Sequence, residues 1–163
     1  MKLSYIIAGV LFISPALAEP TKIKAKDALA AYTALAEIGK GFQHVIKDGG
    51  VDKTVPEQFD FSDNTRSSIA KNIVRLSDAY SPLQKEYAAT VRALCPQGAE
   101  KLLDGTDKCK DNRAQVDKET EAFSDRLIEV DIIQLSEADL KLGKNAISPN
   151  ILAGLGIIIP SLK

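Results

Sequence analysis

The feature that most constrains the fold is an apolar stripe between residues 69 and 94. Its members follow alternating gaps of four and three residues: Ile69, Ile73, Leu76, Tyr80, Leu83, Tyr87, Thr90 and Leu94. This spacing predicts a long helix with one apolar face. Pro82 lies inside the stripe, but the phase continues across it. We therefore favour one helix kinked near Ser81 over a second helix that begins at Pro82.

Two further long helices are predicted from helical spacing. The first runs from Lys22 to Lys47, before the glycines of Asp48-Gly49-Gly50, with this stripe: Ala28, Tyr32, Leu35, Ile38, Phe42 and Val45. The last runs from about Asp111 to Leu142 on another stripe: Val116, Thr120, Phe123, Leu127, Val130, Ile133 and Leu140. Between the first two helices, Val51 to Ser62 is predicted to be a linker around Pro56.

The C-terminal tail adds an apolar set with the spacing of a short helix: Ile151, Leu152, Leu155, Ile158, Ile159 and Leu162. Basic residues predominate from 65 to 94 and acidic residues from 111 to 142, which predicts that these two helices pair antiparallel. The expected fold class is all-α, an antiparallel helical bundle of three long helices plus a short C-terminal helix and one disulfide-closed loop.

The N-terminus has the layout of a secretory signal peptide. Lys2 precedes the apolar run Tyr5 to Ile13, Pro15 follows, and Ala16-Leu17-Ala18 offers a small-residue cleavage pattern. We expect residues 1–18 to be removed and residues 19–163 to form one helical-bundle domain. The apolar run is shorter than the roughly 20 residues that span a bilayer. We therefore expect no transmembrane anchor after cleavage.

The chain has two cysteines, Cys95 and Cys109, and export predicts that they are oxidised. A disulfide between them would close a short loop and stabilise the fold by about 3 kcal/mol in the chain-entropy model. Together with the signal peptide, this predicts a periplasmic or secreted protein.

Charge and motif content argue against several functions. The formal net charge is −1, whereas nucleic-acid-binding proteins usually carry a basic excess. His44 is the only histidine, between Lys40 and Lys47 at helical spacing, which disfavours a metal there. Haem, di-iron, calcium-loop and phosphate-loop patterns are missing from the sequence. We expect no catalytic residues, no metal and no cofactor.

Two apolar segments are candidate partner-binding sites. Phe59 and Phe61 alternate in the linker, so both rings are expected to point the same way. They either contact a partner or plug one end of the bundle, and we favour the plug. In the tail, Ile157, Ile158 and Ile159 either dock on a partner or cover the apolar end of the bundle, and we favour the covering role.

Three functional hypotheses follow. The leading one is an exported, non-enzymatic helical-bundle protein that binds another macromolecule, a protein or an envelope component. The second is a carrier that holds a small apolar ligand between the helices, in a space lined by Tyr32, Tyr80 and Tyr87. The third is an enzyme of an unfamiliar type, in which His44 would need a nearby carboxylate and hydroxyl.

Overall fold

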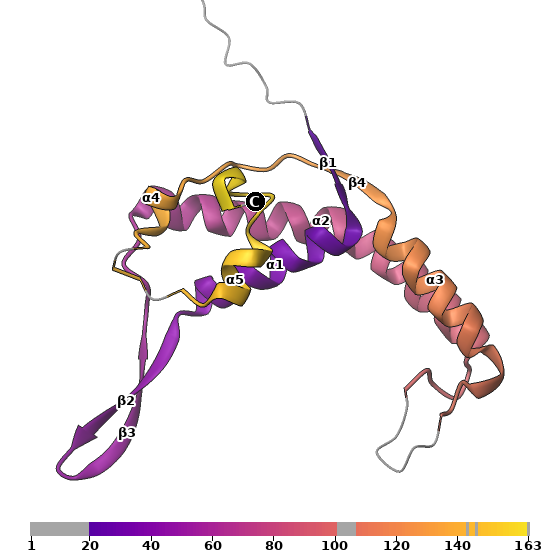
Figure 1. Ribbon diagram of the computed structural model, residues 1–163, viewed down its shortest axis with the longest axis horizontal. Coiled ribbons are helices and arrows are strands. Elements are labelled where there is room, and N and C mark those ends of the chain that lie inside the picture. The colour runs from indigo at the N-terminus through magenta and orange to yellow at the C-terminus, as the bar shows by residue number, and fades with distance from the viewer. Residues whose placement is uncertain (1–19, 101–106, 143, 146, 163) are drawn as a thin grey trace, which may run out of the picture.

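The computed structural model describes residues 20–100, 107–142, 144–145 and 147–162, without the side chains of residues 42–46 and 56. Its longest described element is α2 (Asp63–Leu94), which continues through Pro82 as predicted. The Ser62 hydroxyl caps this helix by accepting a hydrogen bond from the Thr65 N–H at 3.1 Å. The axis of α2 changes direction between the part beside α1 and the part beside α3 (Figure 1).

The first predicted helix is wrong at both ends. Strand β1 (Thr21–Lys24) precedes α1 (Ala25–Lys40), and strand β2 (Phe42–Asp48) follows it. Gly41 separates the helix from β2 with φ of 78° and ψ of −159°, a conformation almost restricted to glycine. A Cβ atom at Gly41 would collide with the carbonyl oxygen of Glu57. The apolar spacing therefore continues past the point where the backbone leaves the helix.

The predicted linker contains the second strand of a hairpin. Strand β3 (Val51–Glu57) pairs antiparallel with β2, from Asp48 opposite Val51 to Phe42 opposite Glu57. Gly49 and Gly50 form the two-residue turn, with φ values of 60° and 85°. Two positive φ values are what a type I′ turn requires. The glycines that were interpreted as a helix end are therefore the turn of this hairpin.

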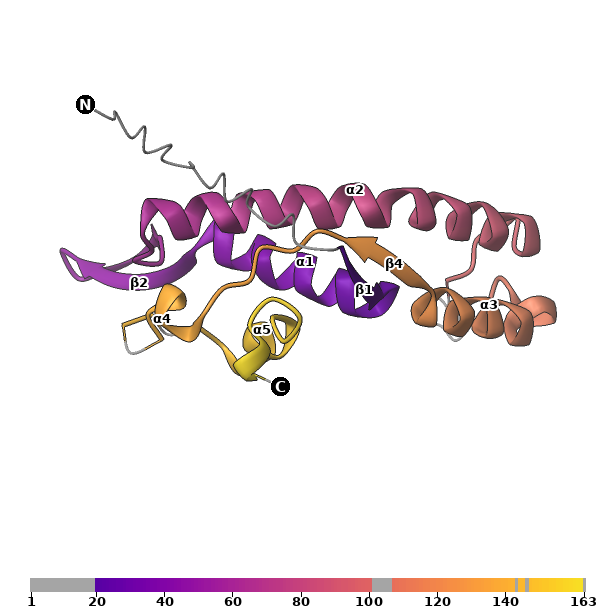
Figure 2. The ribbon, with the colours of Figure 1, turned by 90° about the horizontal axis from the view of Figure 1, so that it is seen from above.

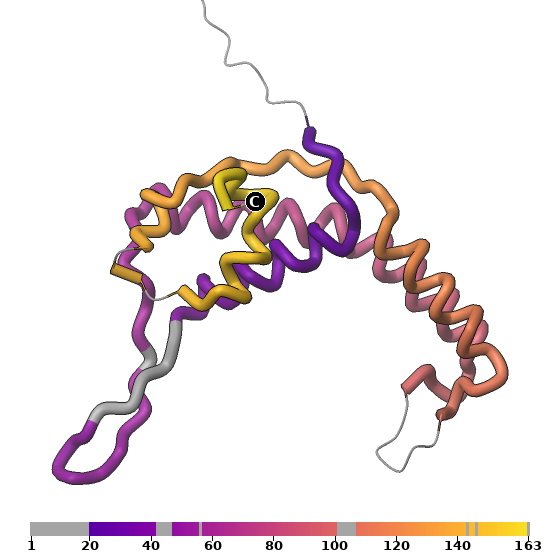
Figure 3. The backbone as a smooth tube through the Cα atoms, viewed as in Figure 1, coloured from indigo at the N-terminus to yellow at the C-terminus, as the bar shows by residue number. Residues whose placement is uncertain are grey.

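The third predicted helix is too long. The short turn η1 (Lys110–Asn112) leads into α3 (Arg113–Asp125), and β4 (Leu127–Val130) then pairs antiparallel with β1. Residues 131–136 continue without a helix to α4 (Glu137–Leu140), along the path traced in Figure 3. The predicted bundle of three long helices is therefore wrong. The fold is mixed α/β, with two small antiparallel sheets.

A buried amide explains why residues 131–136 are not helical. The Asn72 side chain on α2 is completely buried. Its Nδ2 donates to the Ile133 carbonyl at 2.8 Å, and its Oδ1 accepts from the Ile133 N–H at 2.9 Å. Arg75 Nη1 also donates to the Asp131 carbonyl at 3.0 Å. These backbone groups are thus satisfied by α2 rather than by a helical ladder.

The tail completes the core. Helix α5 (Pro149–Gly154) lies against α1, and η2 (Pro160–Leu162) follows it (Figure 2). Gly154 allows this close approach, since a Cβ atom there would lie 2.9 Å from the Ala30 carbonyl oxygen. The main core combines side chains from α1, α2, the 59–61 segment, residues 130–140 and the tail. Its completely buried large residues are Leu35, Leu76, Leu140, Leu155, Ile158 and Ile159.

The end of α1 gives a matched pair of glycine substitutions. Gly41→Ala should lower the free energy of unfolding by at least about 1–3 kcal/mol, from backbone strain and the collision with Glu57. Gly39→Ala should be neutral or stabilising, because a Cβ at Gly39 meets only Ile73 Cδ1, at 3.9 Å. Urea unfolding followed by circular dichroism measures both. Equal effects would contradict the boundary at Gly41.

Candidate functional site

The hairpin of β2 and β3 stands apart from the other described elements. It projects away from the helices in Figure 1, and within the described residues its sheet has only these two strands. Both outer edges therefore carry backbone groups that neither strand satisfies. Its described tip is exposed, and Val51 retains 69% of its accessible surface. Isolated two-stranded hairpins are at best marginally stable in water, so a further strand would add stability.

The two edges of the hairpin differ in hydrogen-bonding capacity. In an antiparallel pair, alternate residue pairs point their N–H and C=O groups outward. Proline within a strand is placed with its missing N–H on the outer side, so Pro56 and its partner Gln43 belong to the outward set. The backbone N–H and C=O groups then also point outward in two further pairs, Val45 with Thr54 and Lys47 with Asp52. The β2 edge therefore has three outward N–H groups, on Gln43, Val45 and Lys47. The β3 edge has one fewer, because Pro56 has no N–H.

The predicted pair Phe59 and Phe61 lies just after the hairpin. The two rings stack with centroids 5.6 Å apart and an interplanar angle of 30°. Both side chains are buried in the main core, with exposures of 4% and 7%. The rings are thus buried, as we favoured, although the bundle whose end they were expected to plug is not formed. A partner-binding role for the pair stays a prediction.

A groove of about 200 Å³ lies beside these rings, between the end of α1 and the first turns of α2. Its surface is mostly apolar, and Gln58 and Arg66 are its two polar side chains. The lining residues are Ile38, Gly39, Gln58, Phe59, Phe61, Arg66, Ile69, Ala70 and Ile73.

Arg66 is held at this groove by three hydrogen bonds to neutral oxygens. Its Nη2 donates to the Phe59 carbonyl at 2.8 Å, Nη1 to Gln58 Oε1 at 3.0 Å, and Nε to the Phe61 carbonyl at 3.4 Å. Within the described ranges, no carboxylate forms a salt bridge with this guanidinium. The groove therefore has a fixed cation that no carboxylate of the described residues pairs.

Asp60 ties the 59–61 segment to the chain before the tail. Its carboxylate lies 3.2 Å from the Lys141 ammonium and 3.2 Å from the Lys144 ammonium. Its N–H donates to Asn145 Oδ1 at 3.0 Å. Hydrogen bonds from Lys141 and Lys144 and their charges lower the pKa of the Asp60 carboxyl below its ordinary value.

The predicted tail residues lie mostly inside the molecule. Ile158 and Ile159 are completely buried in the main core, and Ile157 is half-buried against it. The Ile158 carbonyl also accepts a hydrogen bond from the Leu135 N–H at 3.0 Å. The tail is thus buried in the core beside α1, although the bundle whose end it was expected to cover is not formed. Docking of the tail on a partner stays untested.

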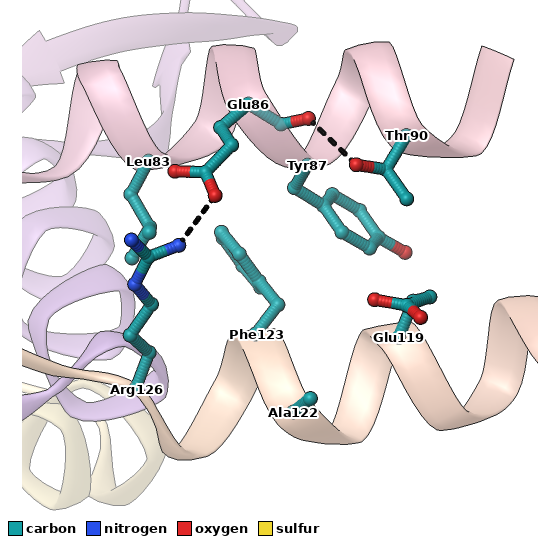
Figure 4. Close-up of a pocket in the computed structure, with 8 residues that line it drawn as sticks. All are labelled: Leu83, Glu86, Tyr87, Thr90, Glu119, Ala122, Phe123 and Arg126. Atoms are coloured by element: carbon teal, nitrogen blue, oxygen red, sulfur yellow. Dashed lines mark hydrogen bonds and ion pairs between the residues drawn. The ribbon is translucent and has the colours of Figure 1, made fainter. Parts of the chain in front are cut away.

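A second cleft, of about 120 Å³, lies between α2 and α3 (Figure 4). The Tyr87 and Phe123 rings stack there with centroids 4.5 Å apart. Arg126 Nη1 lies 2.8 Å from Glu86 Oε1 and bridges the two chain segments. The two helices run antiparallel, as predicted (Figure 1). The predicted charge pattern placed bases on the first of these helices and acids on the second. This ion pair has the reverse arrangement, with its acid on α2 and its base just after α3. The ring stacking and the ion pair join the two helices across this cleft.

The residues proposed for a ligand carrier do not surround one space. Tyr32 contacts the main core from α1. Tyr80 belongs to a separate cluster with Ala25 and Leu83, and burial raises the pKa of its hydroxyl. Tyr87 stacks in the cleft between α2 and α3. The enzyme hypothesis rests on His44, whose side chain lies outside the described residues.

The predicted disulfide between Cys95 and Cys109 is confirmed. It joins the end of α2 to the segment before α3, with the two Cα atoms 5.3 Å apart. Asp107 and Arg113 form an ion pair beside it, and the hydrogen bonds that Arg113 donates to the Asp107 carboxylate raise the pKa of the Arg113 guanidinium. The bridge therefore fixes the far end of the α2–α3 pair.

Other features can be stated for the described ranges only. None of their helices is long and apolar enough to cross a membrane. Within the same ranges, no group of three or more His, Cys, Asp and Glu side chains is placed to hold a metal ion. The predicted signal peptide, residues 1–18, lies outside the described residues. No family model, curated protein or solved structure that was compared with this chain matches it.

Sequence reasoning identified the phenylalanine pair but missed the hairpin and the groove. The hairpin had a signal, because Gly49-Gly50 between two segments that contain valine is a favoured two-residue turn. Gly39 and Arg66 lie in different helices, and no local spacing relates them. They line the same groove only because α1 packs against α2.

The Asp60 contacts predict a pH dependence. Because its folded pKa is lowered, this carboxylate adds stability above its unfolded pKa, and that contribution is lost as the pH falls through the folded pKa. Lys141→Gln with Lys144→Gln should raise the pKa of Asp60 toward its ordinary value in an NMR titration. Lys40→Gln, whose partner is Glu37, is the control. An Asp60 pKa unchanged by the double substitution would refute these pairings.

Proposed function

We propose that this chain is a non-enzymatic protein of the periplasm or the extracellular space that binds another protein through the β2–β3 hairpin. The observation that carries the proposal is the projection of this hairpin from the body, with no further strand of the described residues paired to either edge (Figure 1). Exposed strand edges recruit extended segments of partner proteins, which add as a further strand.

The compartment is proposed from two features. The N-terminal sequence has the charge, apolar run and small-residue pattern of a signal peptide. The disulfide between Cys95 and Cys109 is the oxidised form that is typical of exported proteins. Both features support export.

The β2 edge is the proposed docking strand. It retains the outward N–H groups of Gln43, Val45 and Lys47, whereas Pro56 removes a donor from the β3 edge. A partner segment that pairs with β2 would use main-chain hydrogen bonds for affinity. The sheet would then have three strands, which supports a more stable arrangement than a lone hairpin.

Removing the hairpin tests whether it is the docking element. Because Gly41 and Gln58 lie in contact at its base, two glycines can replace residues 42–57. The shortened protein should keep its helical circular dichroism and melt within a few degrees of the parent, because β2 and β3 contact mainly each other. In a pull-down from envelope extract with mass spectrometry, it should lose the proteins that the parent retains. Equal retention by both proteins would contradict the proposal.

A pair of proline substitutions tests the edge itself. Val45 and Thr54 face each other in the register, with their N–H groups on opposite outer edges. Val45→Pro should weaken capture of the partner at least tenfold, while Thr54→Pro should leave it nearly unchanged. The comparison is matched, because each substitution removes one outward donor from one strand. Similar losses from both variants would count against docking at β2.

A further inference from the structure

We propose that the groove beside Phe59 and Phe61 binds an alkyl carboxylate, such as a medium-chain fatty acid. The alkyl chain would lie on the apolar lining, and the carboxylate would bind the Arg66 guanidinium. This site is separate from the hairpin edge, so it stands or falls independently of the proposed function.

The apolar part of the site is built by two helices and the stacked rings. Ile38 on α1 and Ile69 on α2 are buried beneath it, with exposures of 2% and 4%. Gly39 has no side chain, and a Cβ atom there would reach van der Waals contact with Ile73. Glycine at this position therefore leaves open a space that a larger side chain would occupy.

The polar part of the site is Arg66. A guanidinium has five N–H donors, and three are used on Gln58, Phe59 and Phe61. One donor on each terminal nitrogen remains, and the charge is not paired with a carboxylate in the described ranges. Because the three existing bonds hold the group in place, little side-chain freedom is lost when an anion binds.

The dimensions and the rim favour a small amphiphile over a peptide. At about 200 Å³, the groove is below the 300–1,000 Å³ that is usual for drug-sized ligands. The carbonyl oxygens of Phe59 and Phe61 at the rim already accept from Arg66, so they are less available to a peptide backbone. An apolar wall and one cation remain, which complement an alkyl chain that ends in an anion.

Calorimetric titration of the purified protein with three probes tests the site. Octanoate should bind at one site per chain, and octanol at least tenfold more weakly because it lacks the charge. Octyltrimethylammonium should not bind, since its charge repels Arg66. Arg66→Gln should weaken octanoate binding about tenfold or more, as expected when a charge-assisted hydrogen bond is lost. Arg92→Gln, at the far end of α2, is the control and should bind as the parent does.

Gly39→Leu provides a second variant that keeps Arg66 and its hydrogen bonds. It should fill the groove and abolish octanoate binding, while circular dichroism and thermal melting confirm that the fold is retained. The proposal is overturned if octanoate fails to bind the parent protein. It is also overturned if octanol binds as tightly as octanoate, or if either groove variant, when folded, binds octanoate like the parent.

Discussion

The buried side-chain amide of Asn72 determines how the second half of the chain folds. It offers one donor and one acceptor to the backbone of Ile133, in the same way that a neighbouring strand would. A buried polar group without partners would cost about 1–3 kcal/mol. Asn72 and the backbone of Ile133 therefore satisfy each other, and a helix through Ile133 would break this pairing.

The position of the tail follows from this extended path. With residues 131–136 lying along α2, β4 is placed beside β1 and the Leu135 N–H points to the Ile158 carbonyl. Leu155, Ile158 and Ile159 then fill the space over α1. The two ends of α2 have different neighbours. One lies near the hairpin and the Arg66 groove, and the other is joined to α3 by the disulfide (Figure 1).

Local patterns predicted α2 well and the other long helices poorly. The buried positions Ile69, Leu76, Tyr80 and Leu83 are members of the predicted stripe, because periodicity reports directly on one buried helical face. Leu127, Val130 and Ile133 also fit helical spacing. Their actual conformation depends on Asn72, which is 61 residues from Ile133 in the sequence. Similarly, Gly41 ends α1 within a stripe that continues to Val45. The phenylalanine pair was found from alternation, whereas the groove needs residues from two helices.

Hydrogen exchange at the Ile133 amide tests the role of Asn72 most directly. If the Asn72 amide holds the extended segment, this N–H should exchange only in step with global unfolding, as buried core amides do. In Asn72→Ala, the same amide should exchange many times faster relative to the amides of α2. Rapid exchange of Ile133 in the parent protein, at the rate of an exposed loop, would contradict the account.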